Sequence, residues 1–160
     1  QRYIETYWSK FENIWFHGDY VLKDEDNLWY MQGRTDDVIN VSGHRMSTAE
    51  IEHTVISHKK ISDAASIAIP DEITGEAIVV FFVAENKDDI NLENEITEHI
   101  SKKIGKIAKP RLIIQLTDLP KTRTGKIMRR LLKSKIMGKP LGDLSSLENP
   151  HILNEIQKIN

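Results

Sequence analysis

Residues 33–50 read GRTDDVINVSGHRMSTAE, and this stretch decides the fold. Two glycines punctuate it, and the apolar run Val38–Val41 between them is typical of a short strand. Ser47 and Glu50 then form an S-x-x-E capping box, in which the two side chains satisfy free amides at a helix start. The stretch therefore predicts a strand followed by a helix of about three turns.

Downstream of this stretch, strand-like apolar runs alternate with helical periodicity. The run at residues 78–83 is apolar throughout, which is typical of a strand buried on both faces. After about residue 37 the order is β-α-β-β-α-β-α, which predicts a small α+β domain with a short sheet flanked by helices. The further predicted elements are strands at residues 66–69, 78–83 and 112–116 and helices at residues 91–104 and 125–137.

Upstream, the composition differs sharply from the rest of the chain. The first 33 residues hold 9 of the 11 aromatic residues. Residues 20–23 and 28–32 are strand-like runs separated by a polar cluster, so we expect a β-hairpin. We expect this segment to belong to the edge of a preceding domain, and the chain to be a fragment of a longer protein.

Composition and charge exclude several classes of protein. The 160 residues are 39% hydrophobic, which is enough for a real core, and the net charge is only −2. Residues 101–140 carry 13 Lys or Arg against the single acid Asp118, but no aromatic side chain for stacking on bases. The absence of cysteine excludes disulfides, thiolate metal sites and a cysteine nucleophile. Because the longest apolar runs are too short to span a bilayer and the basic stretch has no aromatic side chain, we expect neither membrane nor nucleic-acid partners. A cytoplasmic location is the default expectation.

Three residues suit the recognition of a nucleotide. Asp19 follows a glycine at a strand start, where a carboxylate can accept hydrogen bonds from vicinal hydroxyls such as those of ribose. On spacing alone, an Asp that ends a turn is the better interpretation. Arg34 and Arg45 flank a strand, and their planar guanidinium groups match phosphate or ribose oxygens. A surface salt bridge with Asp36 or Asp37 explains such an arginine equally well.

A second stretch, PKTRTGKIMRR at residues 120–130, carries a lysine directly after a glycine. It lacks the G-x-x-x-x-G-K-[ST] pattern of a phosphate-binding loop, so a Walker-type NTPase is not expected. What remains is Lys126 at a predicted helix start, free to reach an anion as a compact charge. For an isolated lysine, a solvated basic face is the more ordinary interpretation.

Together, WFHGD at residues 15–19, the stretch from 33 to 52 and PKTRTGKIMRR resemble the C-terminal part of the adenylate-forming enzymes. The resemblance is specifically to the acetyl-CoA synthetase branch of AMP-forming acyl-CoA synthetases, and it covers essentially the whole chain. It implies that residues 1–36 are the end of a large N-terminal AMP-binding domain with its hinge. It implies that residues 37–160 are the C-terminal lid domain.

The resemblance also implies a two-step ligase reaction. A carboxylate, here acetate, attacks the α-phosphate of MgATP to give an acyl-adenylate and diphosphate, and the thiol of CoA then displaces AMP. The lid rotates between the steps, and the chain alone is not expected to turn over. Two alternatives stay open: a ligase for propionate or another short-chain acid, and a free-standing regulatory or binding module.

By match of motif, the resemblance assigns roles around the nucleotide. Asp19 would hold the ribose hydroxyls, Arg34 the ribose and phosphate region, and Arg45 the phosphates of ATP or AMP. Asp36 matches the hinge position. Lys126 matches the lysine that contacts the α-phosphate and carboxylate oxygens, and whose acetylation silences such enzymes, which implies an acetyltransferase and a deacetylase as partners.

Two further sets of residues are assigned in the same way. Ser42 and Gly43 match the loop that lines the tunnel for the pantetheine arm of CoA, although a glycine is equally expected in a simple turn. Ile56, His58 and Ile61 match a stretch where relatives are assigned a Mg²⁺ site. A satisfied histidine at a helix end is the favoured alternative for His58.

Overall fold

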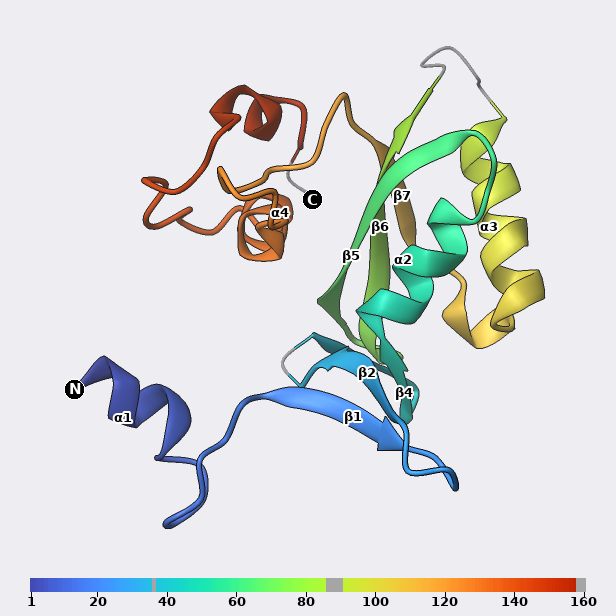
Figure 1. Ribbon diagram of the computed structural model, residues 1–160. Coiled ribbons are helices and arrows are strands. Elements are labelled where there is room, and N and C mark those ends of the chain that lie inside the picture. The colour runs from blue at the N-terminus through green and yellow to red at the C-terminus, as the bar shows by residue number, and fades with distance from the viewer. Residues whose placement is uncertain (36, 86–90, 158–160) are drawn as a thin grey trace.

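The computed structural model describes residues 1–35, 37–85 and 91–157, and its centre is a five-stranded sheet (Figure 1). The sheet order is β4-β3-β6-β5, and β7 lies parallel to β6, whereas the other strand pairs are antiparallel. The strands are β3 (Val38–Val41), β4 (His44–Ser47), β5 (Ile61–Asp71), β6 (Gly75–Ala84) and β7 (Leu112–Gln115).

Strand β6 explains why the sheet is covered on both faces. Its side chains alternate, so Phe82 joins one hydrophobic cluster and Phe81 joins the other. The first cluster includes side chains of α2 (Thr48–Ile56) and α3 (Leu92–Lys103), and the second includes side chains of α4 (Arg129–Ile136) and the 3₁₀ helix η2 (Pro150–Asn154). Figure 1 shows α2 and α3 on one side of the sheet and α4 on the other. The continuous apolar run of β6 therefore reflects burial from both sides.

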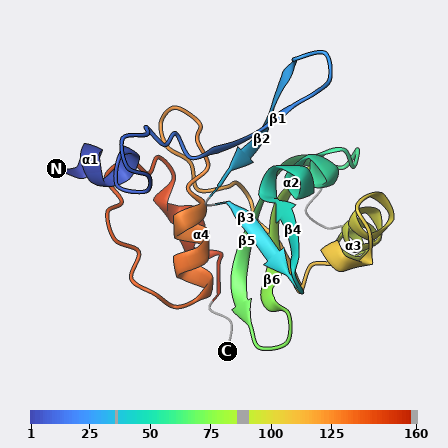
Figure 2. The same ribbon diagram turned by 90° about the horizontal axis from the view of Figure 1, so that it is seen from below.

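The N-terminal segment forms a two-stranded sheet of its own, and none of its described side chains belongs to either core cluster. Strands β1 (Asp19–Lys23) and β2 (Trp29–Arg34) make the predicted hairpin, which projects away from the sheet, and α1 (Arg2–Tyr7) precedes it (Figure 2). Many of its large apolar side chains are exposed, with Trp29 at 69% and Met31 at 65%. Within the described residues, no helix is long and apolar enough to cross a bilayer.

After residue 37, the predicted order of strands and α-helices is confirmed except for an additional strand, whereas α1 and the 3₁₀ helix η2 were not predicted. Strand β4, which forms a hairpin with β3, was not predicted, because its sequence HRMS has no apolar run. Strand β5 extends beyond residues 66–69 in both directions and includes Pro70, which a strand at the sheet edge tolerates. A short 3₁₀ helix, η1 (Lys106–Ala108), lies between α3 and β7.

The predicted start of the last helix at Gly125 is wrong, because α4 begins at Arg129. Residues 120–128 form a closed loop instead, in which Gly125 has a φ of 82°. That conformation suits glycine and is incompatible with a helix start. Lys126 therefore lies in a loop, not at a helix N-terminus.

Candidate functional site

Asp19 and Arg34, both predicted to contact a nucleotide, stand opposite each other in the β1–β2 hairpin. The guanidinium Nη1 of Arg34 lies 3.7 Å from Oδ1 of Asp19 and 3.5 Å from the carbonyl oxygen of His17. The imidazole Nδ1 of His17 is in direct contact with Oδ2 of Asp19. The pair therefore presents a carboxylate and a half-exposed arginine side by side, which can address hydroxyl and phosphate oxygens together.

Arg45 lies on β4 and is held by the neighbouring hairpin. Its Nη2 donates a hydrogen bond of 2.6 Å to the hydroxyl of Tyr20, and its guanidinium lies 5.4 Å from the centre of the Tyr20 ring. Because Tyr20 adjoins Asp19 on β1, all three predicted nucleotide residues lie where the hairpin meets the sheet. An open hollow of about 300 Å³ adjoins this point and is lined by Tyr20, Val38, Arg45, Met46, Ser47 and Glu50.

Ser42 and Gly43 form the two-residue turn that joins β3 to β4. Their φ angles are 50° and 83°, and positive φ at both positions defines the type I′ turn that matches strand twist. Both residues are exposed, and the amide of Ser42 donates 2.8 Å to the carbonyl of Thr74 in the β5–β6 turn. Asp71 in turn fixes Thr74, because its Oδ1 accepts from the Thr74 amide and hydroxyl, each at 2.8 Å. The turn is thus a supported, accessible tip of the sheet.

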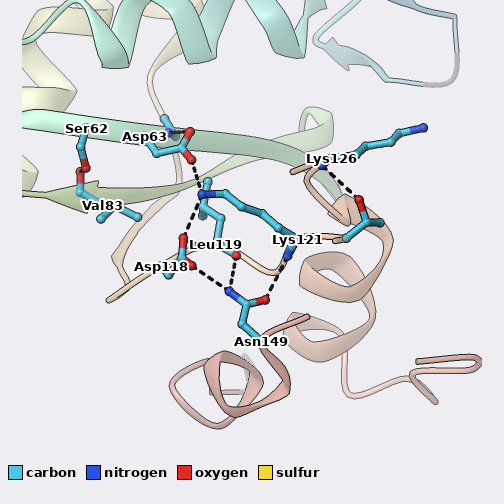
Figure 3. A network of polar contacts seen from close by, with 10 residues as sticks. Ser62, Asp63, Val83, Asp118, Leu119, Lys121, Lys126 and Asn149 are labelled. Atoms are coloured by element: carbon cyan, nitrogen blue, oxygen red, sulfur yellow. Dashed lines mark hydrogen bonds and ion pairs between the residues drawn. The ribbon is translucent and has the colours of Figure 1, made fainter. Parts of the chain in front are cut away.

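Lys126 lies on an exposed loop that closes on itself. The amide of Thr122 donates 2.9 Å to the Lys126 carbonyl, and the Lys126 amide donates 3.1 Å back to the Thr122 hydroxyl. Its side chain points away from the neighbouring polar network (Figure 3). Among the described residues, no acid pairs with its ammonium group. A hollow of about 470 Å³ beside it is lined by Thr122, Arg123, Thr124, Lys126, Ser145 and Ser146.

Lys121, only five residues earlier, has the opposite environment. Its Nζ lies 2.8 Å from Asp63 and 2.9 Å from Asp118. Burial alone would lower the pKa of Lys121, but the hydrogen bonds and charges of these two carboxylates outweigh burial and raise it. Lys121 is therefore committed to the fold, whereas the charge of Lys126 is available to a ligand.

Ile56 and Ile61, two of the three residues predicted to bind Mg²⁺, have side chains without a donor atom. Any contact would have to come from main-chain carbonyls, and the carbonyl of His58 already accepts 2.9 Å from the Ile61 amide. Nε2 of His58 lies 3.5 Å from Glu95, but its buried Nδ1 has no hydrogen-bond partner among the described residues. His58 is thus only half satisfied, and within the described ranges no three acidic, His or Cys side chains gather as a metal would need.

The predicted hinge residue, Asp36, lies outside the described residues. Within them, the structure brings Asp19, Arg34 and Arg45 to one junction, while the hollow beside Lys126 is lined by none of the other predicted site residues. The sequence predictions did not include His17 and Tyr20, although both lie within two residues of Asp19, nor Lys121, although it belongs to the motif PKTRTGKIMRR. Local sequence also did not indicate the contact of Asn149 with Lys121, which spans 28 positions.

Known proteins match this chain closely. An acetyl-coenzyme A synthetase from Pyrobaculum arsenaticum is 44% identical over 160 residues, which cover 99% of this chain and 24% of that protein. The chain thus spans about a quarter of the length of the curated relatives it matches.

Two solved structures extend the comparison. The anthranilate CoA ligase AuaEII in complex with anthranoyl-AMP is 34% identical, with a TM-score of 0.68 over 75% of this chain and 24% of that chain. ATP-bound MatB from Rhodopseudomonas palustris shares the fold, with a TM-score of 0.71 and 23% identity over 79% of this chain and 25% of that chain. Residues 50–126 match the AMP-binding enzyme C-terminal domain. By this match and by its alignment over nearly its whole length, the chain is similar to the C-terminal part of acetyl-CoA synthetases, and the similarity to the AMP-binding enzyme C-terminal domain lies in residues 50–126.

Proposed function

We propose that this chain is the C-terminal portion of an AMP-forming acetyl-CoA synthetase, working with a larger domain that precedes it. Residues 1–36 would end that domain and contain the hinge at Asp36, and residues 37–160 would form the lid. The observation that carries the proposal is Lys126, an exposed cation on a closed loop in a chain 44% identical to acetyl-CoA synthetases. The relatives' name favours acetate over propionate and other short-chain acids.

The proposed reaction has two steps. In adenylation, a carboxylate oxygen of acetate attacks the α-phosphorus of ATP, and the bond to diphosphate breaks. In thioester formation, the sulfur of CoA attacks the acetyl carbon, AMP leaves and the thiol proton passes to solvent. Mg²⁺ bound with ATP would neutralise charge on the phosphates, and the reaction would run in the cytoplasm.

Lys126 would act in the first step. Negative charge develops on the oxygens around the α-phosphorus as acetate attacks, and a fixed cation stabilises that charge more than the ground state. An ammonium group without an internal acid partner loses no existing ion pair when it meets this charge. Acetylation of Lys126 by an acetyltransferase would remove the cation, and a deacetylase would restore it.

The hairpin junction would hold the rest of the nucleotide. The carboxylate of Asp19 suits the ribose hydroxyls, and the neighbouring Arg34 suits oxygens of ribose and phosphate. The bond from Arg45 to Tyr20 supports a fixed orientation of its guanidinium toward phosphate. After rotation, the exposed turn of Ser42 and Gly43 would line the path of the pantetheine arm.

The test uses the complete enzyme that carries this chain. We expect Lys126→Ala to slow formation of acetyl-adenylate by a factor on the order of 10²–10³, because the transition-state charge loses its cation. Thioester formation from supplied acetyl-adenylate and CoA should survive, since a different face of the lid meets the adenylate in that step. Single-turnover rates of the two half-reactions measure both effects.

Arg123→Ala is the matched control, since it removes a cation from the same loop. Nε of Arg123 lies 3.4 Å from Glu148, so its charge is already partly balanced, and adenylation should stay near the wild-type rate. An Lys126→Ala enzyme that is equally slow from supplied adenylate would contradict the assigned role. Comparison of acetate with propionate as substrates tests the choice of acid.

A further inference from the structure

The loop of residues 120–128 is held in place by four polar residues, which we call the loop clamp: Asp63, Asp118, Lys121 and Asn149 (Figure 3). Lys121 begins the loop, and its ammonium group reaches back to two carboxylates. One of them, Asp63, lies on β5, and the other, Asp118, lies in the segment that follows β7. The loop is thereby fastened to the central sheet through a side chain that is largely removed from water.

Asn149 fastens the same loop from the other side. Its Oδ1 accepts 3.1 Å from the Lys121 amide, and its Nδ2 donates 2.9 Å to Asp118 and 2.8 Å to the carbonyl of Leu119. The amide of Glu148 also donates 2.9 Å to the Lys121 carbonyl. The segment around Asn149 is therefore joined to both the main chain and the side-chain partner of Lys121.

A few hydrogen bonds within the loop connect the loop clamp to Lys126. Thr122 follows Lys121 directly and exchanges two hydrogen bonds with Lys126, one through its amide and one through its hydroxyl. The Met128 amide closes the base of the loop on the carbonyl of Pro120 at 2.8 Å. Fixing Lys121 therefore fixes the backbone from which the Lys126 side chain extends.

We propose that Asn149 and Lys121 are positioning residues for Lys126 and that the loop clamp serves the adenylation step. The inference rests on the proposed function, because the loop clamp can affect adenylation only if Lys126 acts in that step. A flexible four-carbon side chain needs a fixed base to reach a reacting phosphate, and a misplacement of about 1 Å can cost a factor of about 10² in rate. As positioning residues, both would act through Lys126 rather than by touching substrate.

The decisive variant is Asn149→Ala in the complete enzyme, which removes three hydrogen bonds at the surface of the loop. We expect the single-turnover rate of adenylation to fall about tenfold or more. Thioester formation from supplied acetyl-adenylate should stay within about twofold of wild type. Asn154→Ala is the matched control, because Asn154 is an exposed asparagine on the same tail, and both half-reactions should keep their rates.

A double mutant separates positioning from a merely structural role. If Asn149 acts through Lys126, the enzyme with both Asn149→Ala and Lys126→Ala should adenylate no more slowly than Lys126→Ala alone. Amide hydrogen exchange at Thr122 and Lys126 should also be faster in Asn149→Ala than in wild type. If Asn149→Ala does not fold, Lys121→Met and Lys121→Arg replace it, with slow adenylation expected for Met and rescue for Arg.

The outcomes distinguish this inference from the function on which it rests. If Lys126→Ala slows adenylation but Asn149→Ala does not, the clamp has no positioning role and the proposed function stands. If Asn149→Ala slows both half-reactions equally, or if the two substitutions multiply, Asn149 acts on structure and the inference is overturned. If Lys126→Ala leaves adenylation unchanged, the proposed function itself fails.

Discussion

Lys121 and Lys126 show how differently two lysines of one short motif are used. The first is paired with Asp63 and Asp118, while the second extends into solvent from the same loop. Replacing either lysine removes one positive charge, but we expect the two replacements to affect the stability of the fold differently. Loss of Lys121 leaves two carboxylates without their shared cation, whereas loss of Lys126 leaves the fold intact.

The contribution of Asp71 to the stability of the fold should depend on pH. Hydrogen bonds from the amide and hydroxyl of Thr74 hold its pKa below the ordinary 3.8. A lowered pKa in the folded state means that the carboxylate stabilises the fold above about pH 4 and loses this effect as the pH falls. We expect Asp71→Asn to lower the free energy of unfolding at pH 7 and to differ less from wild type at pH 3.

Urea unfolding of the chain at the two pH values measures this difference, and Glu72→Gln, a neighbouring exposed acid, serves as the control. A stability difference that stays the same at pH 3 would contradict the prediction. Because the Thr74 carbonyl supports the Ser42 amide, the same variant should also loosen the Ser42–Gly43 turn.

For the proposed nucleotide site, the sequence predicted candidate residues but not the contacts that hold each of them. Asp19, Arg34 and Arg45 could be singled out from their neighbours along the chain. Their support could not, because Tyr20 contacts Arg45 across 25 positions and Asn149 contacts Lys121 across 28. Such partners follow from tertiary packing, which local spacing does not encode.

At the scale of elements, a largely buried ion pair ties α2 to α4. Glu52 accepts two hydrogen bonds from Arg129, at 2.9 and 2.6 Å, and it also accepts 2.8 Å from the Ser66 amide on β5. Only 9% of the Glu52 side chain is exposed. The first residue of α4 is therefore fixed to the helix on the other face of the sheet.

Breaking this ion pair should lower the free energy of unfolding. We expect Arg129→Met to lower the free energy of unfolding by roughly 2–3 kcal/mol, below the range for a fully buried pair because 26% of the Arg129 side chain is exposed. Adding Glu52→Gln should recover part of the loss, since the unpaired buried charge disappears. Denaturant unfolding of the wild type and the two variants measures this, and a double mutant less stable than Arg129→Met would contradict it.

Element types were largely predictable, whereas the start of α4 and both ends of β5 were not. The apolar run of β6 and the Ser47 cap of α2 are encoded locally, and the Ser47 side chain does accept from the Ala49 amide. The start of α4 was misplaced because GKIMRR has helical spacing, yet Gly125 and Thr122 close a loop before it. Hydrogen bonds that close the loop within residues 120–128 outweighed the helix propensity of this segment.

For the whole molecule, both described core clusters lie between Ile39 and Ile156, whereas the first 35 residues leave many apolar side chains exposed. We expect a chain of residues 37–160 to unfold cooperatively on its own, because it keeps every member of both clusters. It should also bind less of a hydrophobic dye such as ANS than residues 1–160 do.

Circular dichroism during heating and dye fluorescence at equal concentration measure the two effects. Loss of cooperative unfolding on removal of residues 1–36 would show that the hairpin is part of the same folding unit. Equal dye binding by both chains would show that the exposed aromatic segment does not form the main apolar surface.

The contact between Asn149 and Lys121 also bears on the order in which the protein is made. A chain emerges from the ribosome from its N-terminus, so Lys121 and its loop become available before Asn149 does. The strands of the sheet and the helices α2, α3 and α4 precede Asn149 in the chain, so they can begin to pack while the loop still lacks this contact, whereas η2 follows it. Lys126 and its loop therefore gain this support only once Asn149 has been added, after the strands β1 to β7 that precede it in the chain.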